Sequence, residues 1–377
     1  MPPAVPEPPP PRILSTGRAL PPHFADQETL LARFRALWGQ KHFNLERLEQ
    51  LHRAVRVGGR HLALPIDDYE KLTTFAQRND AWIGAAVDVG EAALRQALDR
   101  AGLGPDQLDH LFFVTVTGIA TPSIDARLIN RLGLRPDLKR TPIFGLGCVA
   151  GAAGIARAAD YLRGFPGQTA ALLSVELCSL TLQREDLSIA NIIASGLFGD
   201  GAAAVVAVGG EQAQAMQEAG ASGAPGTTPR RGPEIIATRS VFYPDTERVM
   251  GWDVVDSGFK VILSSGVPAL VQARIRGDVD AFLAAQGLAR GDIRHWVCHS
   301  GGPKVLEAFE SALELPREAL QRTWESLQSV GNLSSASVLF VLDGLLGEGE
   351  RSARPGELGL LLAMGPGFCS ELVLLRW

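Results

Sequence analysis

The chain has 377 residues, of which 46% are apolar and 20% are charged, a composition typical of a globular protein with one large core or two fused halves. The formal net charge is -5 and the basic residues are scattered, which excludes the basic stripe of a nucleic-acid-binding protein. No run reaches the about 20 apolar residues of a membrane span, and four widely spaced cysteines favour a reducing, cytoplasmic compartment over a disulfide framework.

Composition divides the chain into a tail, two halves and a segment between them. Residues 1–11 are rich in proline, which predicts an extended, flexible tail and not a signal peptide. Residues 12–209 and 234–377 are the two halves, which show no clear sequence repeat. Residues 210–233 are rich in glycine, alanine and proline, and we expect a flexible surface excursion there.

In the first half, nearly continuous apolar runs predict strands that are buried on both faces. These runs cover residues 108–118, 171–180 and 201–209, and a helical spacing of apolar residues covers 149–164. The alternation of strands with helices predicts a layered α/β architecture.

The second half alternates in the same way. Residues 293–300 read as a strand, followed by a helix over 301–315 that Ser300 can cap and that has Pro303 near its first turn. The ending, residues 356–377, predicts two strands around a Gly-Pro-Gly turn.

Cys148 follows Gly145-Leu146-Gly147 at the junction between an apolar strand and a helix. The glycines permit a sharp turn, and the free N–H groups and dipole of a helix N-terminus favour thiolate and can receive an oxyanion. This setting predicts an acylatable nucleophile. A buried structural cysteine is the alternative that the segment alone leaves open.

The same turn also fits the dinucleotide-binding pattern G-x-G-x-x-G/A, through Gly145, Gly147 and Ala150. That pattern requires an acidic residue about 20 positions later, at the end of the next strand. Glu176 lies farther along and inside its strand, so an NAD-dependent oxidoreductase is the weaker hypothesis.

His299 stands at the end of the strand HWVCH, where α/β proteins usually build their sites, and a thiol that transfers acyl groups needs a base or a donor nearby. A satisfied structural histidine is the alternative. His295 and His299 share a strand face, but Cys298 faces the other way and no further ligand cluster follows, so we expect no zinc site.

Asn332 precedes a helical pattern that we interpret as amphipathic. It can be an N-cap or turn residue, or its amide can donate to a developing oxyanion. Composition does not separate the two.

Together these residues carry a family resemblance. The motifs occur in the order found in type III polyketide synthases, the chalcone synthase-like enzymes: GLGCVAGAAG, LFGDGAAAVV, HSGGPKVLE, GNLSSASVLF and MGPGF. The chain resembles this family, and its bacterial members in particular, from residue 12 onward. The resemblance implies a thiolase-like five-layer αβαβα fold with two similar halves, assembled as a homodimer.

Carried over residue by residue, the resemblance implies that Cys148 is the nucleophile, that His299 and Asn332 assist it, and that Phe198 is a gatekeeping aromatic residue. Further residues are implied to line the substrate pocket: Thr121, Cys178, Thr181, Val261, Ser334, Gly365 and Pro366. Three positions depart from the family pattern. Met364 stands where the family has a phenylalanine before Gly365-Pro366-Gly367, and Val261 stands where it has a second gatekeeping phenylalanine. Thr121 stands where the plant enzymes have a methionine that reaches into the partner subunit's site.

The implied chemistry is the loading of a starter acyl group from acyl-CoA onto Cys148, followed by decarboxylation of malonyl-CoA and attack of the enolate on the acyl thioester. His299 and Asn332 would hold the enolate oxygen, and Phe198 would exclude water. We expect no metal, redox cofactor or carrier protein. Arg53, Arg56 and Arg60 are the predicted cations for the CoA phosphates at the mouth of a tunnel.

Cys178 and Val261 both favour a long apolar pocket, so a fatty acyl starter and an alkylpyrone or alkylresorcinol product are expected. A ketoacyl synthase III-like initiation enzyme is the nearest alternative, and a catalytically silent thiolase-fold binding protein is a further one. The starter, the number of extensions and the mode of cyclisation are not encoded in any motif that we find.

Overall fold

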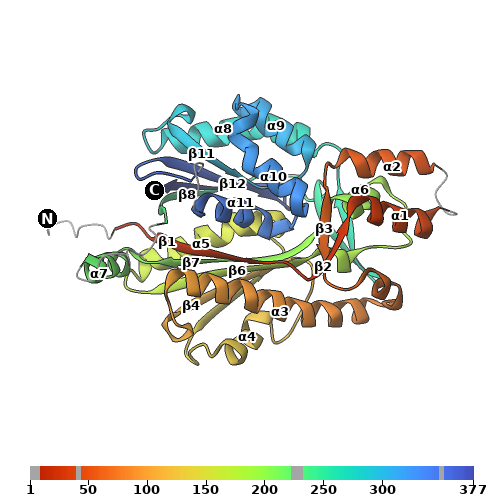
Figure 1. Ribbon diagram of the computed structural model, residues 1–377. Helices are drawn as coiled ribbons and strands as arrows, with labels where there is room; N and C mark the ends of the chain where they lie inside the picture. The colour runs from red at the N-terminus through yellow and green to blue at the C-terminus, as the bar shows by residue number, and fades with distance from the viewer. Residues whose placement is uncertain (1–8, 40–43, 222–231, 348–351) are drawn as a thin grey trace.

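The computed structural model describes residues 9–39, 44–221, 232–347 and 352–377, so most of the predicted tail lies outside the described residues (Figure 1). The main strands form one nine-stranded sheet in the order β11-β12-β13-β8-β1-β7-β6-β4-β5. Its strands are β1 (Arg12–Ala19), β4 (His110–Thr115), β5 (Lys139–Phe144), β6 (Thr169–Leu177), β7 (Asp200–Val208), β8 (Glu234–Phe242), β11 (Ile293–Cys298), β12 (Leu358–Gly365) and β13 (Cys369–Arg376).

The two predicted halves meet at the middle of this sheet. β1 pairs along its length with β7 but touches β8 through one residue pair, Arg12 with Glu234. The nine strands therefore form two smaller sheets that are joined at one corner, and α5 (Ala150–Gly164) and α11 (Ser337–Leu346) lie between them (Figure 1).

Helices cover both sheets and fill the space between them. α5 and α11 share one apolar cluster with strands of both halves. α3 (Phe75–Ala101) and α4 (Ile124–Leu132) cover the outer face of the first half, and α8 (Val267–Ala284), α9 (Pro303–Leu313) and α10 (Gln321–Val330) that of the second. The predicted αβαβα layering is confirmed.

Burial on both faces explains the continuous apolar runs. In β12, Leu361 and Ala363 pack toward the middle helices, whereas Leu360 and Leu362 pack toward the outer ones. The middle position also explains why α11 is buried on nearly all sides, and not amphipathic as the sequence suggested.

Two further local predictions are wrong. Ser300 does not cap α9, which begins at Pro303 after Gly302, although the proline is at the predicted place. The first part of the segment 210–233 is a helix, α7 (Gly210–Ala221), because its glutamines, alanines and glutamates are good helix formers. Residues 222–231 lie outside the described residues.

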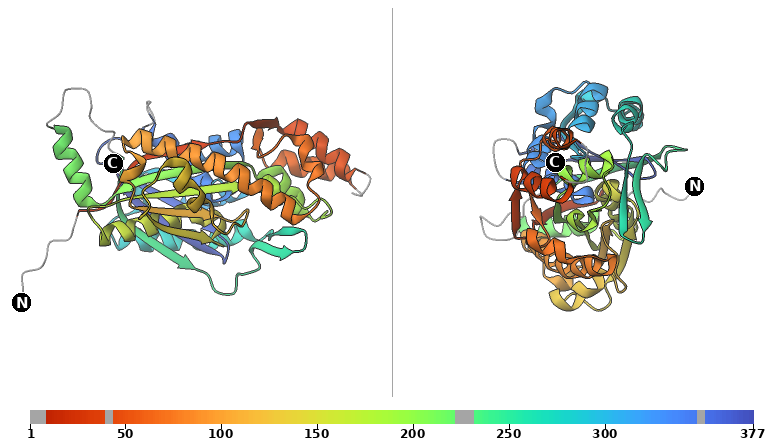
Figure 2. Two further views of the ribbon diagram at one scale, coloured as in Figure 1. Left: turned by 90° about the horizontal axis from the view of Figure 1, so that it is seen from below. Right: turned by 90° about the vertical axis from the view of Figure 1, so that its right-hand side faces the viewer.

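Smaller elements gather at one end of the molecule. They are β2 (His23–Asp26), β3 (Gly59–Leu62), α1 (Gln27–Trp38), α2 (Leu45–Ala54), α6 (Ile189–Leu197) and the hairpin β9 (Met250–Val255) and β10 (Gly258–Leu263). Figure 2 shows the hairpin as an arm at the same end as α1 and α2. Among the described residues, no helix combines the length and apolar character needed to cross a membrane.

Candidate active site

Cys148 lies in one 3-10 turn, Gly147–Val149, between β5 and α5. Gly145 and Gly147 have φ of 99° and 54°, so both are in the left-handed region that the predicted sharp turn requires. A Cβ at Gly147 would approach Cδ of Pro366 to 2.7 Å, and one at Gly365 would approach the Val149 nitrogen to 2.6 Å. The β12–β13 turn therefore packs directly against the cysteine turn.

The Cys148 thiol is buried, with its Sγ 3.7 Å from Oγ of Ser334. Burial raises the pKa of Cys148 to about 12, although the hydrogen bond to Ser334 opposes this shift, and Glu176 adds to it. Burial acts against the thiolate that the helix N-terminus was expected to favour. Burial therefore favours the neutral thiol, whose proton must be removed for attack on a thioester.

His299 directly follows β11, and its backbone N–H donates to the Leu362 carbonyl at 2.9 Å. Its Nδ1 is buried without a partner among the described residues. Burial lowers the pKa of His299 to about 4, so the imidazole is neutral at pH 7 and carries one N–H donor and one acceptor nitrogen. In the described parts of the chain, the Cys148 side chain makes a hydrogen bond with Ser334 and no hydrogen bond with His299.

Asn332 makes hydrogen bonds through both ends of its side-chain amide. Its Oδ1 accepts from the Ser334 N–H at 2.8 Å, which is a turn-stabilising contact, and from Oγ of Ser337 at 3.3 Å. Its Nδ2 donates to the Gly301 carbonyl at 3.3 Å, next to His299. An amide nitrogen has two hydrogens, so one remains for another acceptor.

A small chamber lies at Cys148, and a larger cavity adjoins it at Cys178. The chamber holds about 30 Å³, and its walls include Cys148, Cys178, Phe198, Val261, Ser334 and Pro366. The larger cavity holds about 360 Å³, shares Cys178, Phe198 and Val261 with the chamber, and continues along Thr181. Gly365 packs beneath the cysteine turn, whereas Thr121 lines a separate hollow with Phe144.

Sequence reasoning missed Trp252, which lines both spaces. It lies opposite Val261 in the register of the β9–β10 hairpin, so the two side chains share one face. The aromatic ring that Val261 lacks is therefore supplied by its cross-strand neighbour. Only knowledge of the hairpin register would have revealed this.

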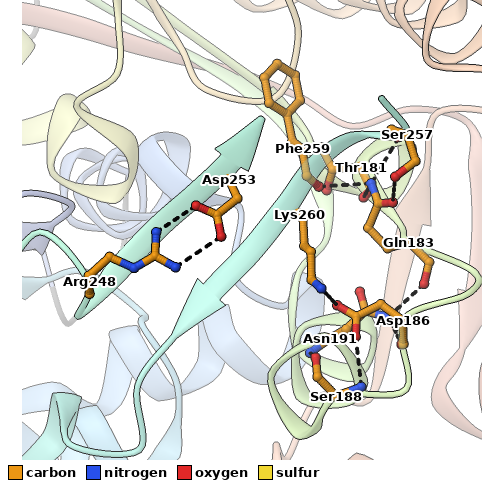
Figure 3. A network of polar contacts seen from close by, with 10 residues as sticks. All are labelled: Thr181, Gln183, Asp186, Ser188, Asn191, Arg248, Asp253, Ser257, Phe259 and Lys260. Carbon is orange, nitrogen blue, oxygen red and sulfur yellow. Dashed lines mark hydrogen bonds and ion pairs between the residues drawn. The ribbon is translucent and has the colours of Figure 1, made fainter. Parts of the chain in front are cut away.

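A polar network fixes this hairpin to the cavity wall (Figure 3). Nε2 of Gln183 donates to the carbonyls of Ser257 and Phe259, both at 3.1 Å, and its Oε1 accepts from Oγ of Ser257 at 2.6 Å. Nζ of Lys260 lies 3.7 Å from Oδ2 of Asp186. These contacts hold Val261 and Trp252 in place.

The predicted arginine cluster is divided. Arg53 and Arg56 are exposed and pair with Glu28 and Glu307 respectively. Arg60 is not at a tunnel mouth, because it is 2% exposed and donates to backbone carbonyls inside the protein. Pairing of β3 with β2 places Arg60 on the inner face of this short strand.

The dinucleotide hypothesis fails at Glu176. This carboxylate is fully buried and accepts from Oγ of Ser335, from Oγ1 of Thr117 at 2.9 Å and from the Val116 N–H at 3.1 Å. It has no exposed oxygen to offer a ribose. Among the described residues, no group of three or more His, Cys, Asp and Glu side chains is arranged to hold a metal ion.

Comparisons with known proteins agree with the motif order. The family described as "Chalcone and stilbene synthases, N-terminal domain" matches residues 7–211, and the corresponding C-terminal domain matches residues 234–377. A 1,3,6,8-tetrahydroxynaphthalene synthase of Streptomyces peucetius subsp. caesius is 51% identical over 97% of this chain and 93% of its own length. A putative chalcone synthase of Bacillus subtilis (strain 168) is 36% identical over 97% of this chain and 98% of its own.

A solved structure has the same fold. The crystal structure of 1,3,6,8-tetrahydroxynaphthalene synthase from Streptomyces coelicolor A3(2), described as a bacterial type III polyketide synthase, matches with a TM-score of 0.87 and 30% sequence identity. The match covers 97% of this chain and 99% of that one.

Proposed function

Since the chain belongs to the chalcone and stilbene synthase family and is a type III polyketide synthase, a decarboxylating condensing acyltransferase, we propose that it uses malonyl-CoA as both starter and extender. The growing poly-β-keto chain would then close into a hydroxylated aromatic ring. The observation that carries this proposal is the 51% identity, over nearly the whole chain, to a protein named for making tetrahydroxynaphthalene. Hydroxyl groups on alternate ring carbons are what closure of such a chain produces.

Loading would begin at Cys148. Its sulfur attacks the thioester carbonyl of the CoA substrate, neutral His299 takes the thiol proton, and the proton then leaves with the CoA thiol. The raised pKa of Cys148 and the lowered pKa of His299 disfavour a stable thiolate–imidazolium ion pair. Proton transfer is therefore coupled to attack.

Extension would use the two donors near the cysteine. Loss of carbon dioxide from a further malonyl-CoA leaves an enolate, whose oxygen accepts from the free Nδ2 hydrogen of Asn332 and from the N–H of neutral His299. The enolate carbon attacks the acyl-Cys148 thioester and releases the sulfur. Phe198, in the chamber wall, would keep water away from this step.

CoA phosphates require exposed cations, and Arg53 and Arg56 are the predicted residues that remain at the surface. The Arg56 guanidinium also lies 5.6 Å from the ring centre of Trp324. Free CoA thioesters would suffice as substrates, whereas a ketoacyl synthase III-like enzyme would need a carrier protein.

A fatty acyl starter with an alkylpyrone or alkylresorcinol product is the second candidate. The cavity of about 360 Å³ beyond Cys178 favours it, because Leu30, Phe34, Leu37, Leu62 and Ile66 give that cavity apolar walls. This volume is in the range of about 300–1,000 Å³ that small-molecule sites occupy.

We also propose a homodimer in which Thr121 faces the partner chain. Ile119 and Phe144, beside Thr121, are 46% and 51% exposed and give this end of the molecule an apolar surface. Sedimentation of the purified protein tests the assembly, and a monomer at micromolar concentration would refute it.

The test of the function is a product assay with labelled malonyl-CoA, alone and with acyl-CoA starters of increasing length, read by mass spectrometry. The proposal expects a hydroxylated aromatic product from malonyl-CoA alone. Products that form only when a long acyl-CoA is added would support the second candidate instead.

A further inference from the structure

Arg60 places a buried cation in the wall of the larger cavity. Burial lowers the pKa of Arg60 to about 10, so the guanidinium stays protonated at neutral pH. A buried charge is costly unless it is paired and fully hydrogen-bonded. The partners of this side chain therefore indicate whether it is satisfied within the fold.

Those partners are incomplete. Nη1 donates to the carbonyls of Ser195 at 2.6 Å and Phe198 at 3.2 Å, at the C-terminal end of α6. Among the described residues no carboxylate lies within 4.0 Å of the guanidinium, and its Nε–H is buried without a partner. The oxygens of the neighbouring Asp200 accept instead from the N–H groups of Ala63 at 2.7 Å and Ser179 at 2.8 Å.

The polar side chains around Arg60 are already engaged with one another. Tyr69 and Ser179 share a hydrogen bond at 2.5 Å, and Ser179 also donates to Asp200. Arg60 is therefore the cavity-lining donor next to Cys178 whose hydrogen bonds the fold leaves incomplete. A plain alkyl chain offers no acceptor there, whereas a poly-β-keto chain carries a carbonyl oxygen on every second carbon.

We propose that Arg60 binds a ketone or enolate oxygen of the growing chain in this cavity and thereby selects keto chains over alkyl chains. This inference rests on the proposed function and names the residue that would recognise the chain beyond Cys148. The apolar walls hold the carbon skeleton and the guanidinium holds an oxygen. Charge-assisted hydrogen bonds of this kind change affinity by about tenfold or more.

Variants of Arg60 test the proposal. Arg60→Met keeps the length and removes the charge, so the ratio of the longest product to early-released short products should fall by about tenfold, while acyl loading on Cys148 persists. Arg60→Lys should recover part of that ratio. Arg33→Met is the matched control, because Arg33 also lines the cavity but is exposed and paired with Asp67. An unchanged product ratio in a folded Arg60→Met enzyme would overturn the proposal.

A measurement on the unaltered enzyme covers the case in which Arg60→Met does not fold. Two non-hydrolysable pantetheine analogues of equal chain length, one alkyl and one with ketones on alternate carbons, are compared as inhibitors. The keto analogue should bind about tenfold more tightly. Equal inhibition contradicts the role of Arg60 whichever starter the enzyme takes, whereas absence of an aromatic product from malonyl-CoA alone contradicts the proposed function.

Discussion

Phe198 and Asn332 are held side by side by a backbone bridge that joins the two halves of the chain. The Asn332 N–H donates to the Leu197 carbonyl and the Gly199 N–H donates to the Asn332 carbonyl, both at 2.9 Å. The residue proposed to keep the site dry and the residue proposed to bind the enolate are therefore fixed side by side through their backbones. This bridge, together with the packing of Gly147 against Pro366 and the contact of Cys148 with Ser334, joins the two halves at the site.

Asn332→Ala should separate the two proposed steps. Removal of the Nδ2 donor should slow malonyl-CoA decarboxylation by about 100-fold or more, because that donor acts only on the enolate. Loading of Cys148 should survive, and both rates can be followed by release of carbon dioxide and by protein mass. Ser337→Ala is the control, since it removes a partner of Oδ1 and not the donor. Equal loss of both steps would show that Asn332 is mainly structural.

Cys178→Phe should close the passage between the chamber and the larger cavity, because Cys178 lines both. Long products should be lost selectively while short products persist, whether the starter is malonyl or fatty acyl. Mass spectrometry of the products from the variant and the unaltered enzyme gives the two chain-length profiles to compare. An unchanged profile would mean that the chain does not pass Cys178.

The pH dependence of Cys148 reactivity follows from its surroundings. Burial raises the pKa of the thiol to about 12, so alkylation of Cys148 by a small reagent should accelerate by about tenfold per pH unit from pH 7 to 10 without a plateau. Peptide mapping separates this residue from the other cysteines. A plateau below pH 8 would reveal a preformed thiolate and contradict the coupled proton transfer described above.

Gly147→Ala should destabilise the fold. The alanine would have to adopt φ near 54°, and its Cβ would approach Pro366 to 2.7 Å. Together these should lower the free energy of unfolding by roughly 1–3 kcal/mol. Denaturant unfolding measures the loss. Gly164→Ala in α5 is the control, because a Cβ there meets nothing within 4 Å, and its stability should be unchanged or higher. An unchanged free energy of unfolding in Gly147→Ala would mean that the turn can rearrange to accept the Cβ.

The sequence predicted the elements whose signals are local. The Gly145-Leu146-Gly147-Cys148 turn, the buried strands and the final pair of strands follow from glycine spacing and continuous apolar runs, which depend on near neighbours. The layered fold and the family followed from the order of five motifs. In these respects residues close in sequence carried the information.

The remainder depends on contacts between distant segments. The sequence analysis predicted Arg60 at the surface, because the four residues of β3 carry no pattern that predicts their pairing with β2. Trp252 was missed because its register against Val261 appears only in the folded hairpin. The high pKa of the Cys148 thiol comes from its burial in the folded chain, which no local pattern encodes.

The most direct test of the account is the mass of the peptide that contains Cys148 after brief incubation of the protein with malonyl-CoA alone. We predict that this peptide gains the mass of a malonyl-derived acyl group and that the peptides of Cys178, Cys298 and Cys369 do not. A label on one of those three cysteines, or acylation of Cys148 by a long-chain acyl-CoA but never by malonyl-CoA, would contradict the account.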